Sequence, residues 1–168
     1  ISFWFKPLNL DINRHIILDK SSNGEYALAL ETNGALTYYH ADFTWTAYDP
    51  GTFVNGNWYF ISLVRNNTNK TVSSYINSSL KKQTNFQNMP QSSANLLWLG
   101  RGHGSDKLLN GVFDEFRLYR AALLESQLKE LFMLDKSHIK YLGYWDNMMG
   151  MANNQYLYET KSHGNTIF

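Results

Sequence analysis

Short apolar runs separated by polar turns dominate the first 119 residues. In EYALALET (25–32), Tyr26, Leu28 and Leu30 share one face, which is the period-2 pattern of a half-buried strand. WYFISLV (58–64) is apolar nearly throughout, as expected of a central strand covered on both faces. The pattern predicts further strands at 1–6, 14–18, 35–41, 43–48, 72–77, 79–84, 96–100 and 112–119.

Asn-Gly pairs mark several of the connections, at 23–24, 33–34, 55–56 and 110–111. Asn-Gly supplies the two positive-φ positions of a type I′ turn, which is the strongest short hairpin signal. The first two pairs bracket the strand at 25–32, and the second joins it to the next strand. This arrangement predicts an antiparallel meander.

One helix is predicted at 124–134 from a single apolar stripe at i, i+4, i+7 and i+8. The stripe consists of Leu124, Leu128, Leu131 and Phe132. Many short strands and a lone late helix predict an all-β fold. We expect a two-sheet antiparallel sandwich with one short C-terminal helix.

Composition narrows the function classes. A chain of 168 residues with 43% hydrophobic and 17% charged residues suits one globular domain. The net charge of +1 does not indicate the excess of positive charge that is typical of nucleic-acid-binding domains, so no nucleic-acid partner is expected. The absence of cysteine excludes disulfides and thiolate zinc sites. No transmembrane segment and no signal peptide are visible. Since Ile1 opens inside a strand pattern, we interpret the chain as a piece of something longer.

A series of stretches within residues 1–134 resembles the laminin G-like, concanavalin A-like jelly roll. They are ISFWFKP, WYFISLVR, YIN, LLWLGR, NGVFDEFRLYRAAL and ESQLKEL, in the family's order. The resemblance implies a jelly roll of two curved sheets that is usually non-catalytic. Such modules bind glycans or proteins, or act as spacers, often with one calcium at the rim. Leu124 stands where the family usually has a serine N-cap, which forgoes about 1 kcal/mol of capping.

The tail departs from the family pattern. Residues 1–137 look like a laminin G-like jelly roll without its usual pair of opening strands. Residues 138–168 resemble those opening strands, in YLGYW (141–145) and YETKSHGNTIF (158–168). The tail is therefore a strand donor to a neighbouring chain, a permuted return to the same sandwich, or the start of a next repeat. A sandwich without an edge strand exposes unpaired backbone, and strand addition fills such a gap.

Asp114 is the candidate metal ligand. In phase with Phe116 and Leu118, it is expected on an apolar face, where a carboxylate needs a cation or hydrogen-bond donors. The family often places a rim calcium at this aspartate, and Glu159 occupies the place of a second family aspartate. The resemblance thus implies a structural Ca²⁺ held by Asp114 and Glu159. Alternatively, Asp114 caps a turn or pairs with an arginine, and Glu159 is solvated.

Other polar and aromatic residues suit ligand binding or modification. Trp45 and Tyr48, with His103 and Asp106 of the RGHGSD loop, are candidate glycan-binding residues at the rim. Alternatively, Trp45 is core, Tyr48 packs on a turn and the loop is only solvated. N-glycosylation sequons stand at Asn66, Asn69 and Asn77, and we expect them to cluster on a hairpin tip.

Catalysis has little support, and we predict that the chain is not an enzyme. Asp114 and Glu115 are adjacent in a strand and face opposite ways, whereas a glycosidase needs two converging carboxylates. The histidines show no metal-binding spacing. We predict a non-catalytic adhesion or assembly module of a larger surface, extracellular or filamentous protein, completed by strand exchange. Its partners would be protein, through self-assembly or a neighbouring domain, or glycan. The alternative is a carbohydrate-binding module attached to a larger enzyme.

Overall fold

A computed structural model describes residues 1–10, 14–20, 25–41, 43–49, 51–102 and 108–136. The chain divides into two units, Ile1–Phe132 and Met133–Phe168. The fold below is that of the first unit. The stretches of the tail that resemble opening strands, 141–145 and 158–168, lie outside the described residues.

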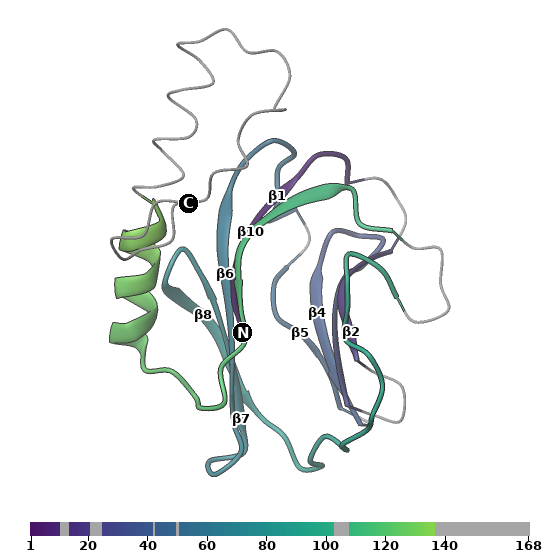
Figure 1. The fold of residues 1–168 in the computed structure, drawn as a ribbon, viewed down its shortest axis with the longest axis vertical. Coiled ribbons are helices and arrows are strands. Elements are labelled where there is room, and N and C mark those ends of the chain that lie inside the picture. The colour runs from purple at the N-terminus through teal and green to yellow at the C-terminus, as the bar shows by residue number, and fades with distance from the viewer. Residues whose placement is uncertain (11–13, 21–24, 42, 50, 103–107, 137–168) are drawn as a thin grey trace, which may run out of the picture. The chain divides into compact units, whose positions relative to one another are not determined.

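Ten strands form two antiparallel sheets of five strands each in the described part (Figure 1). The first sheet, in spatial order, consists of β10 (Gly111–Arg117), β1 (Ser2–Pro7), β6 (Tyr59–Asn66), β7 (Thr71–Ile76) and β8 (Ser79–Asn85). The second consists of β5 (Phe43–Thr46), β4 (Leu36–His40), β3 (Tyr26–Leu30), β2 (His15–Lys20) and β9 (Trp98–Leu99). The predicted meander is confirmed as β2 to β5, and so is the two-sheet jelly-roll sandwich.

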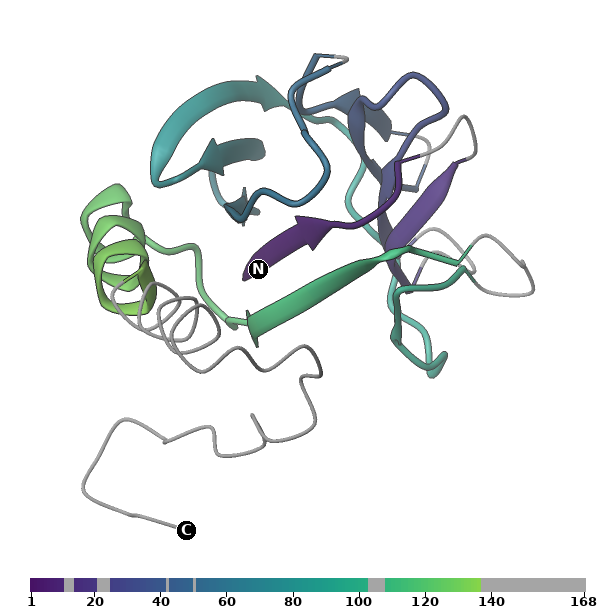
Figure 2. The ribbon, with the colours of Figure 1, turned by 90° about the horizontal axis from the view of Figure 1, so that it is seen from above.

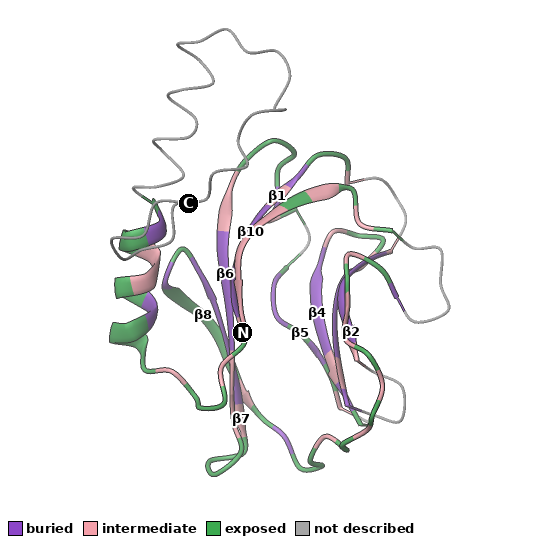
Figure 3. Ribbon diagram, viewed as in Figure 1, coloured by how far each residue is buried: buried purple, intermediate pink, exposed green. Residues whose placement is uncertain are grey.

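The core lies between the two sheets, and most strands contribute buried apolar residues to it. Figure 3 marks the buried residues on the ribbon. Phe3 and Phe5 of β1 meet Phe113 of β10 at ring distances of 5.7 Å each. β8 is the contrast, because six of its seven residues are exposed and two are lysines. Lysines on an edge strand discourage pairing with other chains.

A helix at 125–136 follows β10, and its first part, up to residue 132, packs on the outer face of the first sheet. Phe132 stacks on Trp4 at 5.7 Å and lies 5.9 Å from Phe60. β6 is therefore covered on both faces, as its apolar sequence predicted. The predicted stripe is wrong at Leu124, which is 67% exposed because it is the N-cap and precedes the first helical turn. The backbone N–H of Leu124 donates to Gln127 Oε1 at 2.8 Å, which is half of a capping box.

The Asn-Gly pairs that the structure describes do not form type I′ turns. In the pair Asn33-Gly34, only Gly34 has a positive φ (+79°). Its N–H donates to the Glu31 carbonyl at 2.8 Å, which makes a tight turn between β3 and β4. At Asn110-Gly111 the expected turn is wrong, because Gly111 begins β10. A Cβ there would lie 2.6 Å from the Phe5 ring, so glycine is required by close approach to β1.

β10 runs beside β1 (Figure 2). A β-bulge interrupts β10 within this pairing. Ser2 pairs with Arg117 and Trp4 with Asp114, so β10 has one extra residue in between. Glu115 takes the positive φ (+49°) that the bulge needs. Phe113 and Phe116 consequently both belong to the core although they are three residues apart.

Candidate functional site

A cavity of about 470 Å³ opens where segments from both sheets meet at one end of the sandwich. Tyr26 of β3 and Tyr38 of β4 line it from the second sheet. The end of β6 and the β6–β7 turn (63–68) line it from the first sheet, and the connection 118–123 closes it. Ile1 and Leu128 complete the lining. All of these residues belong to the first unit.

Arg65 is the central polar group of this cavity. Its Nη1 donates to the Tyr38 hydroxyl at 3.3 Å, and its guanidinium lies 5.8 Å from the centre of the Tyr26 ring. Burial raises the pKa of both Tyr26 and Tyr38, and the positive charge of Arg65 partly offsets that rise. Both hydroxyls therefore stay protonated at neutral pH and can donate hydrogen bonds. Asn66, Asn67 and Thr68 add further polar groups to the lining.

A second polar cluster, on the outer face of the second sheet, pairs its own charges with one another. Arg14 forms an ion pair with Glu31 at 3.2 Å and lies 4.7 Å over the Tyr39 ring. The Tyr39 hydroxyl donates to Glu31. Burial, with this hydrogen bond, raises the pKa of Tyr39 to about 12. Because the charges neutralise one another, this cluster offers less to an incoming ligand than the cavity does.

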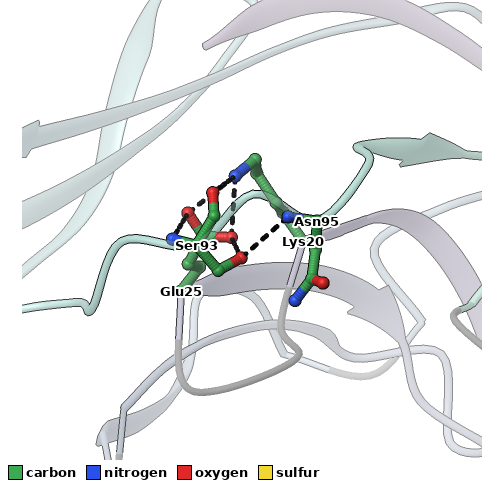
Figure 4. Close-up of polar contacts among 4 residues, drawn as sticks. All are labelled: Lys20, Glu25, Ser93 and Asn95. Atoms are coloured by element: carbon green, nitrogen blue, oxygen red, sulfur yellow. Dashed lines mark hydrogen bonds and ion pairs between the residues drawn. The ribbon is translucent and has the colours of Figure 1, made fainter.

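A third cluster fastens the long connection 86–97 to the β2–β3 hairpin (Figure 4). Lys20 Nζ contacts both Glu25 carboxylate oxygens at 2.7 Å, and Glu25 also accepts from Ser93 N–H at 2.9 Å and Ser93 Oγ at 2.5 Å. Ser93 Oγ in turn accepts from Asn95 N–H at 3.1 Å. Each of these residues forms a hydrogen bond or an ion pair with another member of the cluster, so we assign the cluster a structural role.

Asp114 is held by the bulge. One carboxylate oxygen accepts from the Glu115 N–H at 2.8 Å, and Glu115 pairs with Arg117. The expectation that Asp114 shares a face with Phe116 is wrong, because Asp114 pairs with the outward-facing Trp4 and the bulge reverses the phase. Among the described residues no three His, Asp or Glu side chains gather as metal ligands. Glu159 lies outside the described residues, so calcium at Asp114 and Glu159 stays a prediction.

The predicted rim residues fall in other places. Trp45 and Tyr48 are each 6% exposed and belong to the hydrophobic core. The prediction that they bind glycan at the rim is corrected accordingly, since a buried ring presents no face to a sugar. Burial also raises the pKa of Tyr48. His103 and Asp106 lie outside the described residues.

The sequons lie at two separate turns. Asn66 is the last residue of β6, and Asn69 lies in the β6–β7 turn, so both are at this hairpin tip as predicted. Asn66 Oδ1 accepts from Asn69 N–H at 3.0 Å. Asn77 is in the β7–β8 turn instead, with φ of +49°, and its Oδ1 accepts from Phe60 N–H at 3.0 Å. Asn66 also lines the cavity, so a glycan attached there would restrict it.

The fold described above is an antiparallel β-sandwich of the jelly-roll class, with a ligand-sized cavity at one end. Residues 1–129 match the laminin G family model described as the concanavalin A-like lectin/glucanases superfamily. The chain belongs to this family. The resemblance noted from the sequence is thereby confirmed.

Several solved structures share this fold. The binding domain of Paraclostridial Mosquitocidal Protein 1 has a TM-score of 0.63 at 19% identity, over 79% of this chain and 36% of that one. CBM40 of the Ruminococcus gnavus IT-sialidase, bound to α2,3 sialyllactose, has a TM-score of 0.58 at 13% identity. The match covers 78% of this chain and 80% of that one. The receptor binding domain of botulinum neurotoxin type G has a TM-score of 0.58 at 17% identity. The match covers 80% of this chain and 37% of that one. At these identities the likeness shows the fold alone.

No curated protein matches the chain. This chain spans only 36% and 37% of the mosquitocidal and botulinum structures. In the part of the chain that the structure describes, no helix is both long and apolar enough to cross a membrane.

Proposed function

We propose that the chain is a non-catalytic glycan-binding module of a larger secreted or cell-surface protein. The sandwich-end cavity carries this proposal, because about 470 Å³ of space is lined by three tyrosines beside hydrogen-bonding side chains. Ligand sites commonly occupy about 300–1,000 Å³ and combine apolar or aromatic walls with a few polar groups. Membership in a lectin/glucanase superfamily supports the proposal, as does the sialyllactose-bound CBM40 of the same fold.

The chemistry of the lining favours binding over catalysis. Of the sixteen described residues that line the cavity, none is aspartate or glutamate. Glycoside hydrolysis ordinarily uses two carboxyl groups flanking the scissile bond. The cavity therefore lacks the usual groups for that reaction, whereas it has the donors and rings that hold a sugar.

The test is a glycan array with the whole chain, followed by titration of its strongest hit. Ala122 is exposed and lines the cavity, so Ala122→Trp fills the site without disturbing the core. We expect this variant to bind the hit at least about tenfold more weakly, a difference of roughly 1.4 kcal/mol. Ala94→Trp is the matched control, because Ala94 is exposed and outside the lining. Equal affinity of the two variants, or an array without hits, would contradict the proposal.

A second candidate function, assembly by strand addition, is favoured by the edge of the first sheet. Among the described strands β10 pairs only with β1, so its other edge offers backbone groups to a further strand. The tail, 138–168, resembles the family's opening strands and is the proposed donor.

Removing the tail tests this second candidate. We expect residues 1–137 alone to be poorly soluble, and a peptide covering 138–168 to restore solubility. Sedimentation and thermal unfolding of the shortened chain give the answer. If the shortened chain is monomeric and folds cooperatively, and the peptide changes neither its sedimentation nor its thermal unfolding, strand addition by the tail is ruled out.

A further inference from the structure

We propose that Arg65 makes the sandwich-end cavity selective for sugars that bear a carboxylate, an inference that rests on the glycan-binding function proposed above. Among the described residues of the lining, the charged side chains are Arg65 and Arg120, and both are positive. The described lining thus has basic groups without an acidic one. Such a site attracts an anion and disfavours a cation.

Arg65 is half-buried at the end of β6, with its guanidinium held beside two tyrosines. The Tyr38 hydroxyl and the Tyr26 ring fix its position without neutralising its charge. No carboxylate of the described residues forms an ion pair with it. An arginine has five N–H donors, and the Tyr38 contact uses one of them.

Three other partly buried cations of the described residues have acidic partners, whereas Lys6 lies over the Trp58 ring. Arg14 pairs with Glu31 at 3.2 Å, and Lys20 pairs with Glu25 at 2.7 Å. Arg117 pairs with Glu115. Arg65 differs from these three because it has no acidic partner among the described residues, and it lies at the wall of a cavity. A charge kept partly out of water without a partner is unfavourable, so a ligand that supplies the partner gains affinity.

A planar carboxylate is the group that fits this position. Guanidinium and carboxylate form paired, nearly parallel hydrogen bonds with a defined geometry. Because the Tyr38 hydroxyl accepts from Arg65, its own hydrogen is free to donate to the same ligand. Asn66, Asn67 and Thr68, at the neighbouring wall, supply donors and acceptors for ring hydroxyls. The ligand class is therefore an acidic saccharide such as a uronic or sialic acid.

Matched pairs of saccharides test the inference by calorimetry with the whole chain. The first pair is trigalacturonate and its methyl ester, and the second is 3′-sialyllactose and its methyl ester. Each pair differs in the carboxylate. We expect one of the acids to bind about tenfold or more tightly than its neutral counterpart. Arg65→Met should remove this preference, whereas Arg101→Met, at an exposed arginine outside the lining, should keep it.

The variants separate the possible outcomes. Arg65→Lys keeps the charge but loses the paired geometry, so it should retain part of the preference; it also serves if Arg65→Met does not fold. Equal affinity for acid and neutral partner, with binding still blocked by Ala122→Trp, would overturn the selectivity and leave the glycan-binding function standing. Binding of no saccharide, on the array or in solution, would overturn both.

Discussion

Trp4→Ala should lower the free energy of unfolding by about 3–5 kcal/mol, the range for removing a large buried aromatic side chain. Trp4 is 4% exposed and lies between the first sheet and the helix. Its ring contacts Phe60 at 5.4 Å and Phe132 at 5.7 Å. The substitution therefore removes the anchor that holds the helix on the sheet, besides leaving a cavity.

Urea unfolding followed by circular dichroism measures this loss. Trp58→Ala is the matched control, because Trp58 is only half-buried and contacts Lys6 at 5.1 Å, and it should lose much less. A Trp4/Phe132 double-mutant cycle should give a coupling energy of about 0.5–1.5 kcal/mol. A loss below about 1 kcal/mol for Trp4→Ala would mean that the helix is not held by this contact.

Glu25→Gln should lower stability at neutral pH by about 1.5–3 kcal/mol, as expected for hydrogen bonds to a charged group. Glutamine cannot form the ion pair with Lys20, and it replaces an acceptor by a donor beside Ser93. The connection 86–97 would then lose its attachment to β2 and β3. Glu130→Gln, at an exposed helix position, is the control and should be within about 0.5 kcal/mol of the native chain.

The effect should also depend on pH. Burial by itself would raise the pKa of Glu25, but the hydrogen bonds from Lys20 and Ser93 outweigh it and hold this pKa below its ordinary value of 4.5. A lowered folded-state pKa means that the site stabilises the fold above the unfolded value and loses this contribution as the pH falls through the folded value. Native chain and variant should therefore differ at pH 7 and converge in strong acid. A difference that grows on acidification would contradict the assignment.

The strands were largely predictable, because alternation and turns are local signals. The central strand at 58–64 and the meander from 14 to 48 are present, with bounds shifted by one or two residues. The strand expected at 96–100 shortens to Trp98–Leu99, because only Leu18 and Asp19 of β2 pair with it. The helix was also predicted, except for the exposed residue at its N-cap.

The site was much harder to predict. One extra residue in β10 reverses the face of Asp114, and single-sequence periodicity does not reveal a bulge. Trp45 has the composition of a sugar platform, yet the facing sheet buries it. The cavity is built from residues near 1, 26, 38, 65 and 120, which no local pattern connects. A signal for Arg65 did exist, because it is a lone charge at the end of an otherwise apolar strand, WYFISLVR.

The proposed glycan site lies in the sandwich-end cavity, and Asp114 is not among the described residues that line it. Its central residues stand on strands. Arg65 belongs to β6, and the two tyrosines beside it, Tyr26 and Tyr38, belong to β3 and β4. Sites built on strands hold their geometry better than sites on loops.

Chemical-shift mapping of the isotope-labelled chain with its strongest array hit tests the central claim most directly. We predict that the shifts concentrate in the backbone amides of 63–68 and 118–123, with Tyr26 and Tyr38 beside them. Shifts confined to the outer face of the second sheet, at Thr37, Tyr39 or Trp98, would place the glycan elsewhere and contradict the account.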